Sequence, residues 1–495
     1  MPGLPTAKPE RAGLGCRFWK KRNKGREKLP ARSSIYRAEQ WRNILMRVVK
    51  IQRTCFVIGV ACALTAWTFD APALTLADAL ALALEKNPGL ASFSWEVRAA
   101  EAREIQSRLR PNPELSIEVE DIALGGGSER GSQSPVRIFP ILQPMPISPQ
   151  SSETQFTLSF AQPIELGGKR VKRMALAARD RDAVCWDYEV ARADVIRDVT
   201  KAFLDVLSAQ ERAALDAALV QLAGQALKSA TSRVEAGRVS PLDATKAETA
   251  LSNAHVRAAG SKSALAAKRI RLAAFWGETE TSFEQADGDL ECVRPMPAWE
   301  SLEDRMRETP DLSRWQAEIV RREASLETEK KKAISDITLH FGYRKLEGSN
   351  ENFLLAGVSV PIPLFNRNQG GIQEAEHLAA KARDGRRAAK IAIHSSLKAM
   401  YEELSAAYAA VSLIKSSILP ATTHTFDQVN EAYRQGKFGY LDVLDAQRTL
   451  FDARREYLDA LKDYHHGVAE MERLFGAPLW EDDGKPTNGM NKENP

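Results

Sequence analysis

The chain has 495 residues, of which 44% are hydrophobic and 27% charged, and its formal net charge at pH 7 is +4. No run of eighteen apolar residues occurs, which argues against a helical membrane span. The five cysteines, Cys16, Cys55, Cys62, Cys185 and Cys292, show no Cys-x-x-Cys spacing, so neither a zinc site nor a disulfide framework is indicated and no cofactor is expected.

The positive charge is concentrated at the front of the chain. Residues 1–53 hold 15 Lys and Arg against 3 acids, so the remainder is net acidic. This segment leads into an apolar stretch at 55–67 and an Ala-x-Ala pattern at 71–73, which together predict a signal peptide over 46–73. Residues 1–45 are interpreted as a basic extension that precedes the true start at Met46. Export explains this basic segment better than nucleic-acid binding does, and cleavage before Cys62, with lipidation, is left open.

The first structural repeat spans residues 74–292. A helical pattern with an Asn87-Pro88 break is followed by strands at about 114–121 and 154–162, joined by the polar loop 122–153. A helix without proline then continues to about Glu235, and its length of about 100 Å exceeds what a globular domain needs. Its apolar residues keep the 3-4 spacing of a coiled coil at Ile196, Val199, Phe203, Val206, Ala213, Ala217, Val220, Gly224, Leu227 and Val234, with Gln210 and Thr231 between them.

The long helix ends in a tip, residues 236–243, and a second tip follows at 435–442. Gly237 and Gly436 are predicted to end their helices in the left-handed conformation, after which a new helix starts and returns. The tips lie 199 positions apart, which indicates a duplicated unit. Taken alone, each tip is better explained as an ordinary helical hairpin turn, and the matched duplication is what favours a functional role.

The second repeat spans 293–478, with strands at about 336–344 and 353–361, and residues 479–495 are expected to be disordered. The predicted fold is mainly α, with long coiled-coil hairpins and four strands per chain. Strands of this length and alternation suit a transmembrane barrel. Four strands cannot close one, so three copies supplying twelve strands are expected. Two soluble hairpins packed on the helices are the alternative.

Over about residues 74–478 the duplicated helix-strand-strand-helix-helix units and paired Gly…Leu-Asp tips resemble the TolC family of outer-membrane efflux channels. The segments 162–170 and 360–370 resemble the branch that serves heavy-metal efflux of the cobalt-zinc-cadmium type. The resemblance implies a homotrimer in the outer-membrane lipid of a Gram-negative cell, with a long periplasmic tunnel. Its implied partners are a periplasmic membrane-fusion adaptor and an inner-membrane proton-driven pump.

The resemblance also implies the site residues. A constriction of the tunnel falls on Asp442 and Asp445, and a tyrosine that ties neighbouring helices falls on Tyr433, with its acidic partner at Asp243. The implied adaptor contacts are Gly237, Arg238, Val239, Ser240, Gly436, Lys437, Phe438 and Gly439. Phe438 stands where a bridging arginine is expected. Carboxylates facing one axis favour cations, although Asp442 could instead be a helix-start charge and Asp445 part of a solvated face.

No catalytic or metal-binding motif is found in the sequence, and the chain is predicted not to be an enzyme. His465 and His466 are adjacent in a predicted helix and point about 100° apart, which makes them a poor pair of ligands. His340 lies on the polar face of a predicted strand, toward a barrel lumen. The predicted function is passive conduction of heavy-metal cations. The same duct for drugs or other solutes and a secreted coiled-coil scaffold without a pore are the alternatives.

Overall fold

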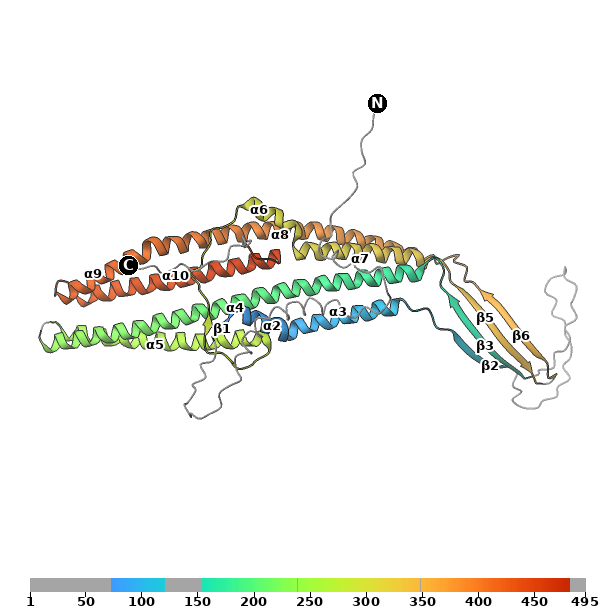
Figure 1. Cartoon of the computed structure of the whole chain (residues 1–495), viewed down its shortest axis with the longest axis horizontal. Helices are drawn as coiled ribbons and strands as arrows, with labels where there is room; N and C mark the ends of the chain where they lie inside the picture. Colours follow the sequence, from blue (N-terminus) through green and yellow to red (C-terminus); the bar gives the residue numbers. More distant parts are fainter. Residues whose placement is uncertain (1–72, 121–153, 238, 348, 481–495) are drawn as a thin grey trace, which may run out of the picture. The chain divides into compact units, whose positions relative to one another are not determined.

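The computed structural model describes residues 73–120, 154–237, 239–347 and 349–480, all within one compact unit that begins at Ala71 (Figure 1). The predicted signal peptide, the polar loop 122–153 and Arg238 lie outside the described residues. The elements are β1 (Leu74–Thr75), α2 (Leu76–Lys86), α3 (Pro88–Ser107), β2 (Glu114–Glu120), β3 (Gln155–Ile164), α4 (Lys169–Glu235), α5 (Pro241–Ala273), η2 (Ala274–Trp276), β4 (Ala286–Asp287), α6 (Trp299–Arg305), η3 (Met306–Glu308), α7 (Pro310–Lys332), β5 (Ile337–Leu346), β6 (Asn352–Ser359), α8 (Gln369–Leu413), η4 (Ile414–Ile418), α9 (Leu419–Arg434) and α10 (Tyr440–Phe475).

The first repeat is built along the 67-residue helix α4. Helix α5 returns from the tip along α4, and α2 and α3 pack on α4 as well (Figure 1). The two shorter pieces meet where the Asn87 side-chain amide donates to the Phe275 carbonyl at 2.9 Å. Asn87 also accepts from the Leu90 amide, so it caps α3 at the same time. This joint sets the two shorter pieces end to end along α4.

The second repeat has the same plan, with α7 and α10 packed along the run α8–η4–α9. Their joint lies where Gly476, in the left-handed conformation, faces Pro310, and where Arg473 donates to Asp311 at 2.7 Å. The long run is not a uniform α-helix. It contains a π-helical turn at η4, just before Pro420, whose ring and missing N–H disturb the preceding helical turn.

The predicted seam of α4 is correct in its first part and wrong in its second. Val199, Phe203 and Val206 are buried, as predicted. Beyond Ser208 the buried positions are Asp216, Leu219, Ala223 and Ala230, each one residue before the predicted Ala217, Val220, Gly224 and Thr231. Here α4 contacts α5 and α10 together, and two partners set a buried face that a single-seam pattern does not capture.

The four longer strands form one antiparallel sheet in the order β2-β3-β5-β6. Their bounds differ by one or two residues from the predicted ones. One face carries exposed apolar side chains, namely Leu115, Ile117, Val119, Phe156, Leu158, Phe160, Phe341, Tyr343, Leu354 and Val358. His340 lies between Ala161 and Gly357 in the ladder, on the opposite parity. Among the described residues, β2 and β6 each have one unpaired edge.

One helical run among the described residues, Gln369–Arg434, contains an 18-residue window that is apolar enough to cross a membrane by length and composition, with mean hydropathy 1.3. Its 66 residues far exceed the roughly 20 that a span requires. The run packs along α7 and α10 as an arm of the second hairpin.

The ordered part of the chain extends beyond the predicted boundary at 478. Leu479 is only 2% exposed, and its amide donates to Glu472 at 3.0 Å. The Trp480 indole donates to the Pro295 carbonyl at 3.1 Å. The expectation of disorder from 479 is therefore wrong for these two residues, and residues 481–495 lie outside the described part.

Candidate gate at the helical tips

The two tips, far apart in sequence, lie side by side. A buried cluster joins Ala230 of α4 and Ala247 of α5 to Tyr433 of α9 and to Tyr440 and Val443 of α10. All four tip helices therefore contribute to one apolar contact. The predicted site residues of both repeats are brought into the same region by this packing.

The tip turns have the predicted glycine geometry. Gly237 and Gly436 have φ values of 69° and 77°, in the left-handed region that other residues reach only at a cost. Ser240 then caps α5 by accepting the Leu242 amide at 3.3 Å. A side chain added at Gly237 would meet nothing within 4 Å, so conformation rather than space requires glycine there.

Asp442 starts helix α10. Its carboxylate accepts the Gly439 amide at 2.9 Å and lies at the positive end of the helix dipole. The helix-start role left open by the sequence is therefore present. Asp445 lies one turn further along α10, and both side chains are exposed. Phe438, Leu441 and Leu242 are 50%, 58% and 57% exposed, which leaves apolar side chains on both tips.

An arginine that the sequence analysis did not single out lies at the centre of the tip contact. The guanidinium carbon of Arg233 lies 4.3 Å from the ring centroid of Tyr433, and Arg233 Nη2 donates to the Arg434 carbonyl at 3.3 Å. Arg233 belongs to the first repeat, and its two contacts belong to the second. Its only signal in the sequence is its place in the last turn of α4, where a cation suits the helix dipole.

The tip tyrosines contact each other through their rings. Tyr433 and Tyr440 have centroids 6.0 Å apart, and both hydroxyls are buried without a hydrogen-bond partner among the described residues. The implied Tyr433–Asp243 bond is therefore not made within this chain. Burial, together with the nearby Tyr433 and Asp243, raises the pKa of Tyr440 to about 12, so its hydroxyl stays neutral at physiological pH.

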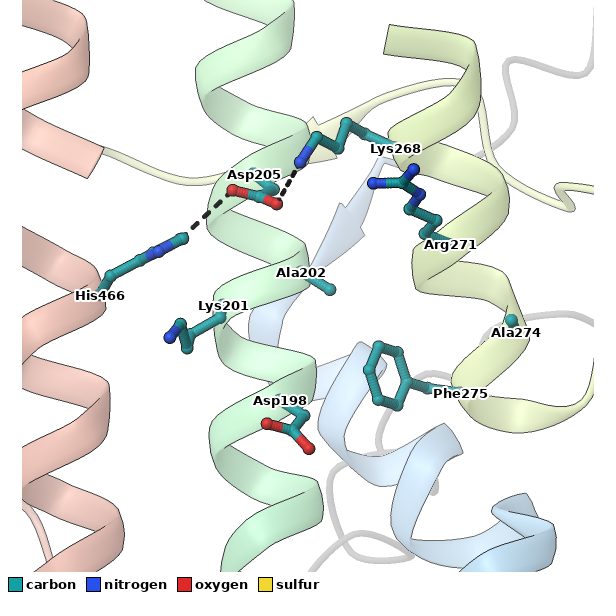
Figure 2. Close-up of a pocket in the computed structure, with 9 residues that line it drawn as sticks. All are labelled: Asp198, Lys201, Ala202, Asp205, Lys268, Arg271, Ala274, Phe275 and His466. Atoms are coloured by element: carbon teal, nitrogen blue, oxygen red, sulfur yellow. Dashed lines mark hydrogen bonds and ion pairs between the residues drawn. The ribbon is translucent and has the colours of Figure 1, made fainter. Parts of the chain in front are cut away.

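Further along the helices, Asp205 of α4 links the two repeats (Figure 2). Its carboxylate lies 3.3 Å from Nε2 of His466 on α10 and 2.5 Å from Nζ of Lys268 on α5. Burial alone would raise the pKa of Asp205, but the contacts with His466 and Lys268 outweigh it and lower that pKa to about 2. The neighbouring His465 instead contacts the Leu290 carbonyl at 2.8 Å, so the two histidines do not converge.

The Asp205 contact is one rung of a ladder between α4 and α10. Each pair lies four or seven residues from the next, the spacing of facing positions in a coiled coil. The pairs are Lys201–Glu470, Asp205–His466, Arg212–Asp459 and Asp216–Arg455. In every pair the two residue numbers add to the same value, because the helices are antiparallel and in fixed register. Among the described residues, no three His, Cys, Asp or Glu side chains are grouped to hold a metal ion.

Comparison with known proteins identifies the family. Residues 79–278 and 304–477 match the family model described as outer membrane efflux protein. The chain belongs to this family. Membership confirms the efflux-channel interpretation, places the chain in the outer membrane with a periplasmic extension, and excludes a secreted scaffold without a pore.

Two relatives are known by function. The cobalt-zinc-cadmium resistance protein CzcC of Cupriavidus metallidurans is 33% identical over 403 residues, which cover 81% of this chain and 90% of the relative. The nickel-cobalt-cadmium resistance protein NccC of Alcaligenes xylosoxydans xylosoxydans is 28% identical over 72% of this chain and 76% of the relative.

Solved structures share the fold at low identity. CusC aligns with a TM-score of 0.63 and 16% identity over 85% of this chain and 96% of its own. The outer membrane protein VceC of Vibrio cholerae aligns with a TM-score of 0.63 and 15% identity over 82% of this chain and 97% of its own. The open state of the MtrE channel of Neisseria gonorrhoeae aligns with a TM-score of 0.59 and 18% identity, over 82% of this chain and 89% of its own.

Proposed function

We propose that the chain forms the outer-membrane duct of a tripartite system that exports heavy-metal cations. It works as a homotrimer, with a periplasmic membrane-fusion adaptor and an inner-membrane proton-driven pump. The observation that supports this most is the four-stranded sheet, which has one exposed apolar face and two unpaired edges. Heavy metals are favoured as the substrate because CzcC and NccC are named for resistance to them.

The sheet alone argues for assembly. Its unpaired edges cannot remain open in lipid, where no water satisfies backbone groups. Pairing β6 of one copy with β2 of the next would continue the antiparallel alternation, and three copies would close a barrel of twelve strands. The apolar face would then meet lipid, and the face that carries His340 and Arg344 would line the lumen.

We propose the tips as gate and docking end. In a trimer the exposed carboxylates of Asp442 and Asp445 would form an acidic ring that favours cations. Tyr433 belongs to the buried cluster that joins the tips, and Asp243 lies near Tyr440 in that cluster. The exposed apolar residues Phe438 and Leu441 suit an adaptor interface. The remaining proposed adaptor contacts are Gly237, Arg238, Val239, Ser240, Gly436, Lys437 and Gly439, of which Arg238 lies outside the described residues.

Bilayer conductance of the purified oligomer tests this proposal. We expect the variant D442N/D445N to lower the cation-to-anion permeability ratio severalfold, because an asparagine oxygen can still accept the Gly439 amide while the charge is lost. Asp463→Asn on the same helix, 68% exposed, is the matched control and should leave the ratio unchanged. An unaltered ratio in the double variant would remove Asp442 and Asp445 from the gate.

The oligomer and the substrate have separate tests. The mass of the detergent-extracted protein should correspond to three copies, and a monomer would contradict the barrel. Deleting the gene should sensitise cells to cobalt, zinc or cadmium, with resistance restored on complementation. Sensitisation to organic toxicants alone would favour a duct for other solutes.

A further inference from the structure

The chain leaves the sheet in two different ways in its two repeats. After β6 it passes through the junction segment, residues 360–365, before α8 begins. Every residue of this segment is exposed, and Ile362, Leu364 and Phe365 are 75%, 64% and 90% exposed. An apolar group of this kind at one place on a surface marks a contact with something else.

The first repeat shows that this exposure is not a general property of the turn. Its corresponding segment is packed and paired, with Glu165 bonded to Arg173 and the Leu166 amide donating to Asp336 at 2.9 Å. The two residues before α4 are Gly167 and Gly168, and a side chain added at Gly167 would lie 2.5 Å from Ile334. The large exposed apolar side chain between residues 162 and 168 is Ile164, at 40%, so this part of the first repeat has no counterpart to the 90% exposed Phe365.

Part of the backbone of the junction segment is hydrogen-bonded within the chain. Pro361 and Pro363 have no N–H to satisfy, and the Leu364 amide donates to the Ile362 carbonyl at 2.9 Å. The Pro363 carbonyl accepts from Nε of Arg367 at 3.2 Å. The Phe365 carbonyl likewise accepts from Gln369 at 3.1 Å. These bonds reduce the number of backbone groups that need water, while the apolar side chains point outward, which suits the boundary between lipid headgroups and hydrocarbon.

We propose that residues 360–365 insert into the periplasmic boundary of the outer membrane, where Ile362, Leu364 and Phe365 contact lipid acyl chains and anchor the sheet-to-helix junction. The proposal rests on the proposed function, since it requires the sheet to span the membrane. The segment begins two residues after Val358, one of the exposed apolar residues of the sheet. Arg367 lies two residues after its end, and a cation at this depth suits the headgroup region.

Lipid explains the segment better than a second copy of the chain. Strand pairing between copies needs backbone donors, and prolines at 361 and 363 remove two of them in succession. Three carbonyls of the segment, those of Ile362, Pro363 and Phe365, already accept from Leu364, Arg367 and Gln369. The β6 edge therefore stops pairing at the point where the outward apolar side chains continue.

Site-specific fluorescence in full-length trimer tests the proposal. Single cysteines replace Phe365, Val358 or Lys437 in a variant without other cysteines, and each carries an environment-sensitive fluorophore. The protein is reconstituted in phosphatidylcholine vesicles with a nitroxide at a shallow or deep position of the acyl chain. Val358 reports the sheet face, and Lys437 reports the exposed tip. Phe365 is 90% exposed, so its replacement is expected to leave folding intact.

We expect the lipid nitroxides to quench the probe at 365 as much as the probe at 358, and to leave the probe at 437 unquenched. At 365 the shallow nitroxide should quench more than the deep one. Quenching at 358 without quenching at 365 would overturn the anchor and leave the barrel standing. If the probe at 365 is shielded from both lipid nitroxide and aqueous iodide, the segment contacts a second copy and the proposal is wrong. Loss at neither 358 nor 365 would overturn the membrane-spanning sheet itself.

Discussion

Arg233 carries the most specific single contact of the tip region. Its guanidinium lies against Tyr433, and it also donates to the Arg434 carbonyl, so one side chain joins the two repeats. The tyrosine hydroxyls beside it bond nothing among the described residues. The tip contact therefore depends on ring faces and charge, and the hydroxyl groups contribute little.

We predict that Arg233→Ala weakens the tip contact by about 0.5–2 kcal/mol, the range for a cation over an aromatic ring. In bilayers the variant should open more often than the unchanged protein. Arg434→Ala is the matched control, because that side chain is 71% exposed and lies 4.0 Å from Glu431. Equal open probabilities in the two variants would show that Arg233 does not hold the tips.

Tyr433→Phe should be nearly neutral for thermal stability or slightly stabilising, since it removes a buried hydroxyl that has no partner. Tyr433→Ala removes the ring beneath Arg233 and should cost about 3–5 kcal/mol, as for other large core aromatics. Melting temperatures of the two variants provide the comparison. A phenylalanine variant as unstable as the alanine variant would reveal a hydroxyl partner, such as one from another subunit.

The roles of Gly237, Gly436 and Asp442 could be predicted from the sequence because each residue acts locally, on a turn or a helix start within a few residues. Arg233 and Tyr433 contact each other across 200 positions, and no pattern in one sequence pairs them. The implied bond between Tyr433 and Asp243 is absent within the chain for the same reason, since the position of its partner depends on tertiary packing.

Among the elements, α7 and α8 approach each other closely at Gly385. A side chain added at Gly385 would lie 2.5 Å from the ring of Trp315, so the indole of α7 lies directly over the backbone of α8. By contrast, a side chain at Gly260 of α5 would meet nothing within 4 Å.

Gly385→Ala should therefore destabilise the protein by about 1–3 kcal/mol through overpacking. Gly260→Ala should stabilise it by up to about 1 kcal/mol, because alanine favours the helix. Thermal unfolding followed by circular dichroism measures both. A gain in stability at Gly385 would mean that Trp315 moves aside without loss, and that the close approach is not required.

Periodicity predicted the order of helices and strands, because long amphipathic helices and alternating strands repeat the same signal over many residues. The π-helical turn at η4 and the one-residue shift of the buried face of α4 were not predicted. Both depend on neighbours, namely the proline that follows η4 and the second helix packed on α4. Their cause lies in contacts between elements, which periodicity within one helix does not record.

At the scale of the whole molecule, the ladder between α4 and α10 fixes the register of the two repeats. Its rungs differ in exposure. Asp216 is 6% exposed at its side chain and Asp205 23%, whereas Arg212 and Asp459 are 39% and 43% exposed. Buried rungs cost more to break than solvated ones, since a lone buried charge is left behind.

The Asp205 rung predicts an acid-sensitive stability. Because the folded pKa of about 2 lies below the ordinary value of 3.8, the ionised carboxylate stabilises the fold above about pH 4. This contribution is lost as the pH falls from about 4 to 2. Asp205→Asn should lower the free energy of unfolding by about 1–3 kcal/mol at neutral pH. Between about pH 4 and 2 the variant should lose less stability than the unchanged protein. Asp459→Asn, on a solvated rung, should change stability by less than about 1 kcal/mol.

Thermal melting between pH 7 and pH 2 checks this prediction. The difference between the unchanged protein and Asp205→Asn should narrow as the pH falls below 4. A constant difference across the range would mean that the carboxylate contributes by packing and not by its charge.

The joints at Asn87–Phe275 and Pro310–Gly476 have a consequence for the reach of the molecule. Each long helix is one piece, but its companions are two separate pieces that only touch. The part between joint and tip can therefore change length without altering the sheet or the pieces beside it. Seven residues added to each of α4, α5, α9 and α10 between the ladder and the tips would move the tips outward by about 10 Å and keep every facing position in phase. Where cell envelopes differ in periplasmic depth, natural selection can thus change the length of the part between joint and tip alone.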